Sequence, residues 1–212
     1  MTFSTRPSKM RTRFIGSLVF TALLVTGCKD SAPPPPVLGT VPAFALQDQD
    51  DKSFTLDDLA GKVWIATFIF TRCSGTCPRQ TSVFYTFQEE LHKRASWRDL
   101  RLVSMTVDPE YDTSAVMKKY AELTLADTTR WHFLTGDRTK LRELCKNGFK
   151  LAVFDQKENP DMPILHSDKI VLVDRQGRIR GYYDGLEEKE QERLRSELEL
   201  VLAETSAASA QQ

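Results

Sequence analysis

The sequence lacks three features that would place it in a specialised class of protein. No apolar run approaches the roughly 20 residues that a membrane-spanning helix requires, and no dense run of Lys or Arg occurs beyond residue 13. Net charge is lacking as well, because 29 Lys and Arg balance 29 Asp and Glu. These absences exclude a multi-pass membrane protein. They also argue against a nucleic-acid-binding protein, which would need a basic surface to bind the phosphate backbone.

The composition is instead that of an ordinary globular protein. Of the 212 residues, 41% are hydrophobic and 27% are charged, which allows one sizeable core and excludes a mostly disordered chain. Residues 40–204 contain no linker or repeat, so we expect one domain, as a monomer. The proline run within residues 28–39 predicts an extended tether, and the Ser-, Ala- and Gln-rich residues 205–212 predict a frayed, disordered tail.

The first 27 residues have the pattern of a secretory signal peptide. Cationic residues between 6 and 13 precede an apolar run, 14–26, that is too short to span a bilayer. The run ends in LVTGC, which resembles the lipobox of bacterial lipoproteins, with Cys28 as the residue to be lipidated. A plain signal peptide with an unrelated cysteine is the alternative. We therefore expect a lipid-anchored protein on the extracytoplasmic (periplasmic) side of a bacterial membrane, held there without spanning it.

The domain alternates predicted strands and helices. The run Val63 to Phe70 is continuously apolar, as in a strand buried on both faces. Further strands are predicted at 100–107 and 169–173, the latter forming a hairpin with residues 178–183, and helices at 78–93, 113–123, 139–146 and 187–203. This order predicts an α/β fold with a mixed central β-sheet flanked by helices, and it is compatible with a thioredoxin-like fold.

Two of the four cysteines lie where the buried strand gives way to a helix. Cys73 and Cys77 occupy this junction, followed by Pro78 at a position suited to the first helical turn. Unpaired backbone N–H groups and the helix dipole there are expected to lower the pKa of a thiol, which favours nucleophilic or metal-binding chemistry. The pair is therefore a candidate redox pair or metal site. A purely structural disulfide between them would close too short a loop to stabilise the fold much.

The remaining candidate ligands differ in promise. The sequence has no second ligand pair for structural zinc, whereas two thiolates and an imidazole suit Cu(I). His92 lies among charged helical residues and is expected to be solvated, while His132 lies in a short apolar segment and is expected to be a satisfied strand or loop residue. His166 precedes a strand in a loop that can face the cysteines, although its position alone leaves the role open. The other residues considered are Cys145, expected in the core or as a third redox thiol, Met105, expected in the core, and Met162, a weak thioether candidate.

Four segments in register resemble one family. They are FTRCSGTCP (70–78), VDPEYDT (107–113), LTG (134–136) and LHS (165–167) leading into IVLVD. The chain thereby resembles the Sco/SenC family, membrane-tethered thioredoxin-like copper proteins that help to assemble the copper centre of cytochrome c oxidase. The resemblance implies that Cys73, Cys77 and His166 bind copper, and that the partner is the copper-bearing oxidase subunit or another copper chaperone. Ser74, Gly75 and Leu165 depart from the Pro, acidic residue and Asp that are common in the family.

The leading functional hypothesis is a copper chaperone, which needs no enzymatic turnover. The alternative is a thiol-disulfide oxidoreductase in which Cys73 and Cys77 are catalytic and form a disulfide. Peroxide removal is weaker, because the CxxxCP spacing is not a peroxiredoxin motif. Nearby Arg72 and Arg79 would lower thiol pKa values, meet an acidic partner or simply be solvated. Asp108 and Asp112 are expected to be turn and helix-cap residues rather than a catalytic pair.

Overall fold

The computed structural model describes residues 1–2, 32–156, 158 and 163–204. Its centre is strand β4 (Val63–Ile69), every residue of which is buried. The main sheet has the order β1-β10-β9-β4-β5-β6. Strand β4 pairs in parallel with β5 (Leu100–Thr106), which pairs in parallel with β6 (Trp131–Leu134). Because β4 also pairs antiparallel with β9 (Lys169–Val173), the sheet is mixed, as predicted.

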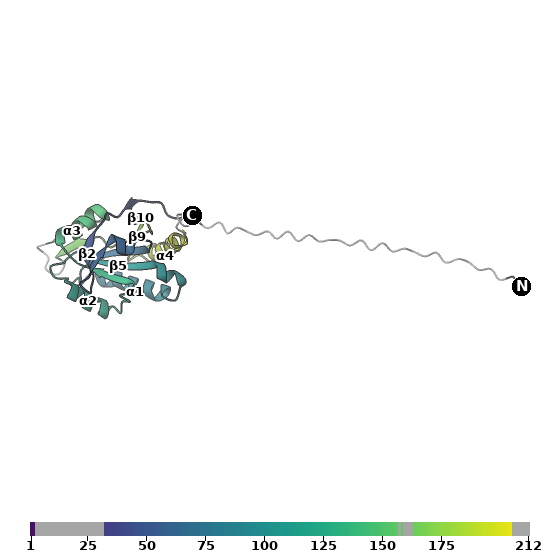
Figure 1. The fold of residues 1–212 in the computed structure, drawn as a ribbon, viewed down its shortest axis with the longest axis horizontal. Coiled ribbons are helices and arrows are strands. Elements are labelled where there is room, and N and C mark those ends of the chain that lie inside the picture. The colour runs from purple at the N-terminus through teal and green to yellow at the C-terminus, as the bar shows by residue number, and fades with distance from the viewer. Residues whose placement is uncertain (3–31, 157, 159–162, 205–212) are drawn as a thin grey trace. The chain divides into compact units, whose positions relative to one another are not determined.

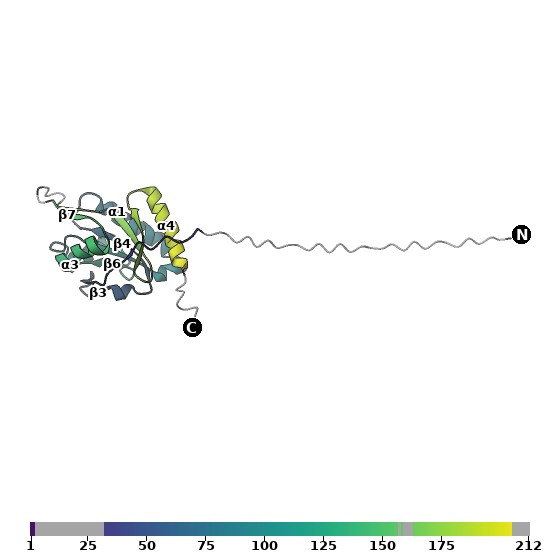
Figure 2. The ribbon, with the colours of Figure 1, turned by 90° about the horizontal axis from the view of Figure 1, so that it is seen from above.

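Helices cover both faces of this sheet (Figures 1 and 2). Phe84 of α1 (Cys77–Leu91) packs on Trp131, and Tyr120 of α2 (Ser114–Leu123) packs on Phe133, which places both helices on one face. Helix α4 (Glu188–Ala203) lies beside α1, where an ion pair joins Arg195 to Glu90. The opposite face carries α3 (Arg138–Glu143) and the π-helical turn Leu144–Gly148 that continues it.

Shorter elements complete the domain. Strand β10 (Arg178–Asp184) forms the predicted hairpin with β9, and its turn contains Gly177 at a φ of 73°. Two small hairpins pair β2 (Ala45–Gln47) with β3 (Ser53–Thr55) and β7 (Val153–Asp155) with β8 (Ile164–His166). Two 3-10 helices span Leu56–Leu59 and Ala95–Asp99. In the part of the chain described, no helix has the length and apolar character to cross a membrane.

Residues 35–40 lie against the main sheet. The guanidinium of Arg180, which is 5% exposed, donates to the carbonyl of Pro35 from Nε at 2.9 Å and from Nη2 at 2.6 Å. The Leu38 amide donates to Ile179, and β1 (Gly39–Thr40) then pairs with β10. The last residues of the predicted tether therefore pack on the domain. Residues 3–27 of the predicted signal peptide, Cys28 and the predicted tail lie outside the described residues.

Candidate metal centre

The two cysteines sit in the connection between β4 and α1, as the sequence predicts. The Cys73 amide donates to the carbonyl of Phe70 at 3.2 Å, which turns the chain sharply after the strand. Cys77 is the first residue of α1, and Pro78 follows it in the first turn, where a missing N–H costs nothing. Cys77 is fully buried, whereas Cys73 is 7% exposed. Both cysteines are therefore buried at the junction, Cys77 completely and Cys73 nearly so.

His166 reaches this junction from the far side of the sequence. It is the last residue of β8, and its Nε2 lies 3.2 Å from the Sγ of Cys77. Its Nδ1 lies 3.1 Å from the carbonyl oxygen of Ser167, which can only accept a hydrogen bond. The proton of the neutral imidazole therefore belongs on Nδ1, leaving the Nε2 lone pair directed at the thiol. The Phe70 ring packs against the imidazole in an edge-to-face arrangement, with 5.7 Å between the ring centroids.

Burial governs the ionisation of both groups. Loss of water raises the pKa of the Cys77 thiol well above its ordinary value, and the neighbouring Cys73 adds to the effect. Burial likewise lowers the pKa of His166. The expectation that the helix N-terminus lowers the pKa is therefore wrong for Cys77, because desolvation outweighs the helix dipole. Both groups are neutral at neutral pH in the absence of a metal. A soft cation would displace the thiol proton of Cys77 and bind the free lone pair of His166.

The third candidate ligand, Cys73, neighbours Cys77 and contributes to the raised pKa of that thiol. The Sγ of Cys73 accepts a hydrogen bond from the Gly75 amide at 3.4 Å, and Cys73, Cys77 and Cys145 are all free thiols. No group of three His, Cys, Asp or Glu side chains among the described residues is already arranged to hold a metal ion. The structure thus brings Cys77 and His166 together, and Cys73 lies in the β4–α1 connection that leads to Cys77.

A buried carboxylate supports the cysteine loop from below. Asp112 is 0% exposed and accepts hydrogen bonds from the Thr71 amide, at 3.1 and 3.3 Å, and from the hydroxyls of Thr71 and Thr106. The sequence predicts a turn or helix-cap role for Asp112. The residue that caps α2 is instead Thr113, whose hydroxyl accepts a hydrogen bond from the Val116 amide. The Asp112 carboxylate instead ties the residue two positions before Cys73 to strand β5.

Two more polar contacts hold the loop. Arg72 Nε donates to Asp108 at 2.7 Å, so Arg72 is not simply solvated, although its side chain is 45% exposed. The Thr76 hydroxyl donates to Asp168 at 2.8 Å and so ties the cysteine loop to the turn that follows His166. The sequence did not single out Asp168, because it lies 92 positions after Thr76 and no local pattern indicates the contact.

Gln80 is a second residue that the sequence did not single out. It lies one turn after Cys77 on the buried face of α1, is 0% exposed, and neither its Oε1 nor its Nε2 has a hydrogen-bond partner among the described residues. Buried amides are nearly always paired, so this one is an exception beneath the candidate site.

The remaining candidates lie elsewhere. His92 is exposed beyond the end of α1, as predicted, and Met105 is fully buried in β5. Cys145 is a core thiol, and burial raises its pKa to about 12. His132 lies in β6, but its buried Nδ1 has no partner among the residues described, so it is not the satisfied residue expected. Met162 lies outside the described residues.

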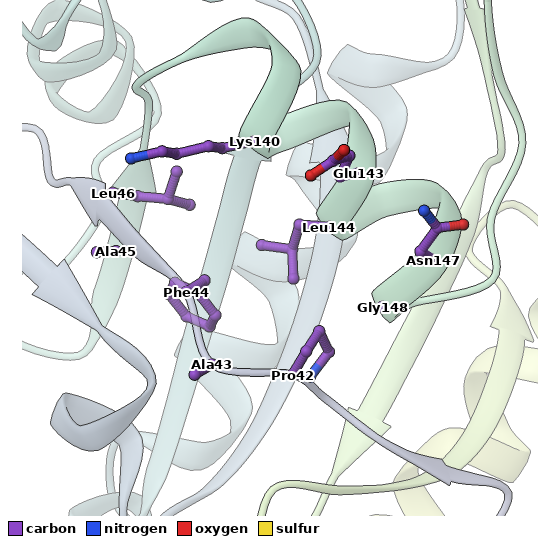
Figure 3. Close-up of a pocket in the computed structure, with 10 residues that line it drawn as sticks. All are labelled: Pro42, Ala43, Phe44, Ala45, Leu46, Lys140, Glu143, Leu144, Asn147 and Gly148. Atoms are coloured by element: carbon purple, nitrogen blue, oxygen red, sulfur yellow. The ribbon is translucent and has the colours of Figure 1, made fainter.

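A pocket of about 770 Å³ on the α3 face offers no such chemistry (Figure 3). It lies between residues 42–46 and the helical segment that includes Leu144 and Gly148, and no cysteine or histidine lines it. The cysteine loop therefore remains the candidate site.

Comparisons with known proteins bear on the family and the fold of the chain. A family model described as SCO1/SenC matches residues 35–202. A SCO1 protein homolog of Bacillus subtilis is 33% identical over 78% of this chain and 84% of its own length. A SCO1/SenC family lipoprotein of Bacillus anthracis has 27% identity and a TM-score of 0.71, over 80% of this chain and 99% of that one.

Two further solved structures bear on chemistry. BsSco, described as a member of the Sco family of cytochrome c oxidase assembly proteins with a disulfide switch, has 30% identity and a TM-score of 0.71, over 82% of this chain and 100% of that one. Bradyrhizobium japonicum ScoI, solved with copper bound, has 25% identity and a TM-score of 0.62, over 74% and 98%. The mixed sheet flanked by helices is thus the thioredoxin-like fold that was predicted.

Proposed function

Because the chain belongs to the SCO1/SenC family, we propose that it binds a copper ion through Cys73, Cys77 and His166 and delivers it during assembly of the copper centre of cytochrome c oxidase. The observation that carries the proposal is the 3.2 Å approach of His166 Nε2 to Cys77 Sγ. The acceptor in this proposal is the copper-bearing oxidase subunit or another copper chaperone, and copper is the cargo.

The donor set fits a soft cation. Two sulfurs and one imidazole nitrogen select Cu(I) over hard ions such as Mg²⁺. His166 is held ready by the Ser167 carbonyl, a contact of the kind that orients metal-ligating imidazoles. Cys73 completes the set, and its sulfur can keep the hydrogen bond from the Gly75 amide while it binds the ion. Binding displaces the thiol protons, and this offsets the burial that keeps Cys77 neutral in the absence of the metal.

Exposure of the loop suits transfer of the cargo. Cys73 is 7% exposed and Cys77 is 0% exposed, so of the two cysteines Cys73 is the one that an incoming ligand from an acceptor meets first. A lipid anchor at Cys28 keeps the domain at the membrane face where an oxidase resides, which raises its effective concentration there. Mass spectrometry of the membrane-extracted protein tests the anchor: an acylated N-terminal Cys28 is expected, and an unmodified N-terminus at another residue would contradict it.

The geometry also favours a second function, reduction of a target disulfide. Because Cys73 is the more exposed thiol, it is the attacking group. Its thiolate breaks the target disulfide, releases one target thiolate and forms a mixed disulfide. Cys77 then attacks Cys73 of that bond, releasing the second target thiol and leaving a Cys73–Cys77 disulfide, so that two electrons pass to the target.

Copper binding to the reduced fragment 32–212 tests the first function. The native chain should retain one Cu(I) per molecule after desalting under anaerobic conditions, whereas the variants Cys73→Ser and Cys77→Ser should lose it. Cys145→Ser is the matched control, because it removes a buried thiol in another part of the core, and it should retain the ion.

The same samples separate the two functions. Reduced native protein that keeps no copper, yet reduces a disulfide-bonded peptide carrying the acceptor's cysteines, would replace the first function by the second. Copper that is retained equally by native and Cys77→Ser protein would contradict the proposed site itself.

A further inference from the structure

An apolar groove runs along the surface away from the cysteine loop. It has a volume of about 390 Å³ and lies between α1, with Pro78 and Tyr85, and the end of α2, with Tyr120, Leu123 and Leu125. Leu123 and Leu125 are 74% and 70% exposed. Two neighbouring leucines left this far in water are unusual for a surface with no partner, and such patches commonly mark interaction sites.

Hydrogen bonds hold the two walls of the groove in place. Leu125 has a φ of 54°, a conformation that costs a leucine free energy. Gln88 of α1, which is 5% exposed, maintains it by donating to the Leu125 carbonyl at 3.1 Å and accepting from the Asp127 amide at 2.7 Å. A hydrogen bond of 2.8 Å between the hydroxyls of Thr81 and Tyr120 ties α1 to α2 at the groove. The turn after α2 is therefore clamped in a form that keeps Leu125 exposed.

The groove begins at the candidate metal centre. Pro78 is bonded to Cys77, and Thr81 follows Cys77 by one helical turn on the same face of α1. Any protein whose ligand atoms reach Cys73 must cover surface around this loop. The groove supplies apolar surface on the α1 side of it, continuous with the site of exchange.

Charged side chains of both signs border the groove, since the exposed Glu122 precedes Leu123 and the exposed Glu89 follows Tyr85 by four residues; the charge at the end nearest the cysteine loop is that of Arg79. Arg79 follows Pro78, and Lys119 precedes Leu123 by four residues on α2, so that it flanks Leu123. Both side chains are exposed, and neither forms an ion pair within the described part of the chain. A partner with an apolar side chain and a carboxylate placed to meet Arg79 would complement the groove at the end nearest the cysteine loop.

We propose that the α1–α2 groove is the docking surface for the protein that exchanges copper with this chain, and that this partner inserts an apolar side chain between Tyr85, Leu123 and Leu125 and places a carboxylate against Arg79. This inference rests on the proposed function and adds to it the surface and the chemistry of the partner. The leucines supply binding energy, and Arg79 supplies orientation and speed of encounter.

The double variant Leu123→Asn, Leu125→Asn tests the groove without disturbing the fold. Asn tolerates the positive φ of residue 125 better than Leu does, and both side chains are exposed, so stability should be kept. The probe is the reduced, copper-free soluble copper-binding domain of the oxidase subunit from the same organism. The matched control, Val37→Asn, Leu38→Asn, changes two exposed apolar residues near β1.

Cu(I) affinity, measured against a chromogenic chelator, should be equal in all three proteins. Transfer to the probe should slow by roughly tenfold or more in the Leu123, Leu125 variant and stay at the native rate in the control, while loss of copper to the small chelator should be equal. Arg79→Ala should slow transfer to the probe at low salt only.

The outcomes distinguish the groove from the site. Equal transfer by native and Leu123, Leu125 variant would overturn the docking surface and leave copper binding intact. A native chain that binds no copper would overturn the proposed function instead. Self-association of the native chain that the variant abolishes would assign the groove to a second copy, and binding to phosphatidylcholine vesicles that the variant abolishes would assign it to lipid; either overturns the inference.

Discussion

The imidazole of His166 lies against Cys77, with 3.2 Å between Nε2 and Sγ, although the two residues are 89 positions apart in the sequence. Strand β8 ends at His166 and helix α1 begins at Cys77, so both side chains are fixed by regular structure rather than by a free loop. Sites placed on such elements hold their geometry well. The relationship makes His166 the most specific test of the proposed metal centre.

Replacement of His166 by Ala should weaken Cu(I) binding by roughly tenfold or more, because a contributing ligand is lost while both sulfurs remain. Competition with a chromogenic Cu(I) chelator measures the effect. His92→Ala is the control, since His92 is exposed outside the site, and its affinity should match that of the native chain. Equal affinity in the His166 variant would remove this residue from the ligand set.

Asp112→Asn should lower the free energy of unfolding by about 2 kcal/mol, because the amide nitrogen cannot accept from Thr71 or Thr106. The same change should loosen the cysteine loop and speed the loss of copper. Urea unfolding measures the first effect. Asp50→Asn, which affects a partly exposed ion pair with Lys118, should cost well under about 1 kcal/mol. A similar loss in both variants would show that Asp112 has no special supporting role.

Gln80→Leu should raise the free energy of unfolding by about 1 kcal/mol, because it removes a buried amide that lacks partners among the described residues. Gln88→Leu is its counterpart on the same helix. Gln88 is also buried but forms two hydrogen bonds, so its replacement should cost about 1–3 kcal/mol. Thermal or urea unfolding compares the pair. A destabilised Gln80 variant would mean that an ordered water satisfies the native amide.

Stability should fall as the pH drops from 6.5 toward 4, in part because of His132. Burial, helped by the charge of Arg101, lowers the pKa of His132 from 6.5 to about 4. In that pH range the unfolded chain binds a proton at His132 that the folded chain does not bind. The free energy of unfolding therefore falls by up to about 3 kcal/mol on acidification. His132→Phe should remove this part of the pH dependence, since a Phe ring can also pack on Phe54. Urea unfolding at several pH values measures it, and an unchanged slope would contradict the assignment.

The sequence by itself determined the elements that depend on local pattern. The apolar run that became β4 and the hairpin of β9 and β10 were predicted nearly to the residue, because burial and turn chemistry act over a few neighbours. The position of Cys73 and Cys77 at a strand-to-helix junction could be predicted for the same reason. The short strands β2, β3, β7 and β8 were not predicted, since two or three residues carry too little pattern.

The tertiary structure decided what depends on contacts across long stretches of chain. It placed His166 on Cys77, Asp112 beneath Thr71, and Gln88 behind the turn that exposes Leu125. It also reversed the expected ionisation of Cys77, because a helix N-terminus is visible in a sequence whereas the depth of burial is not. The residue types that suit copper are thus a property of the sequence. Their approach to one another, and the surface beside them, arise only when the sheet and helices pack.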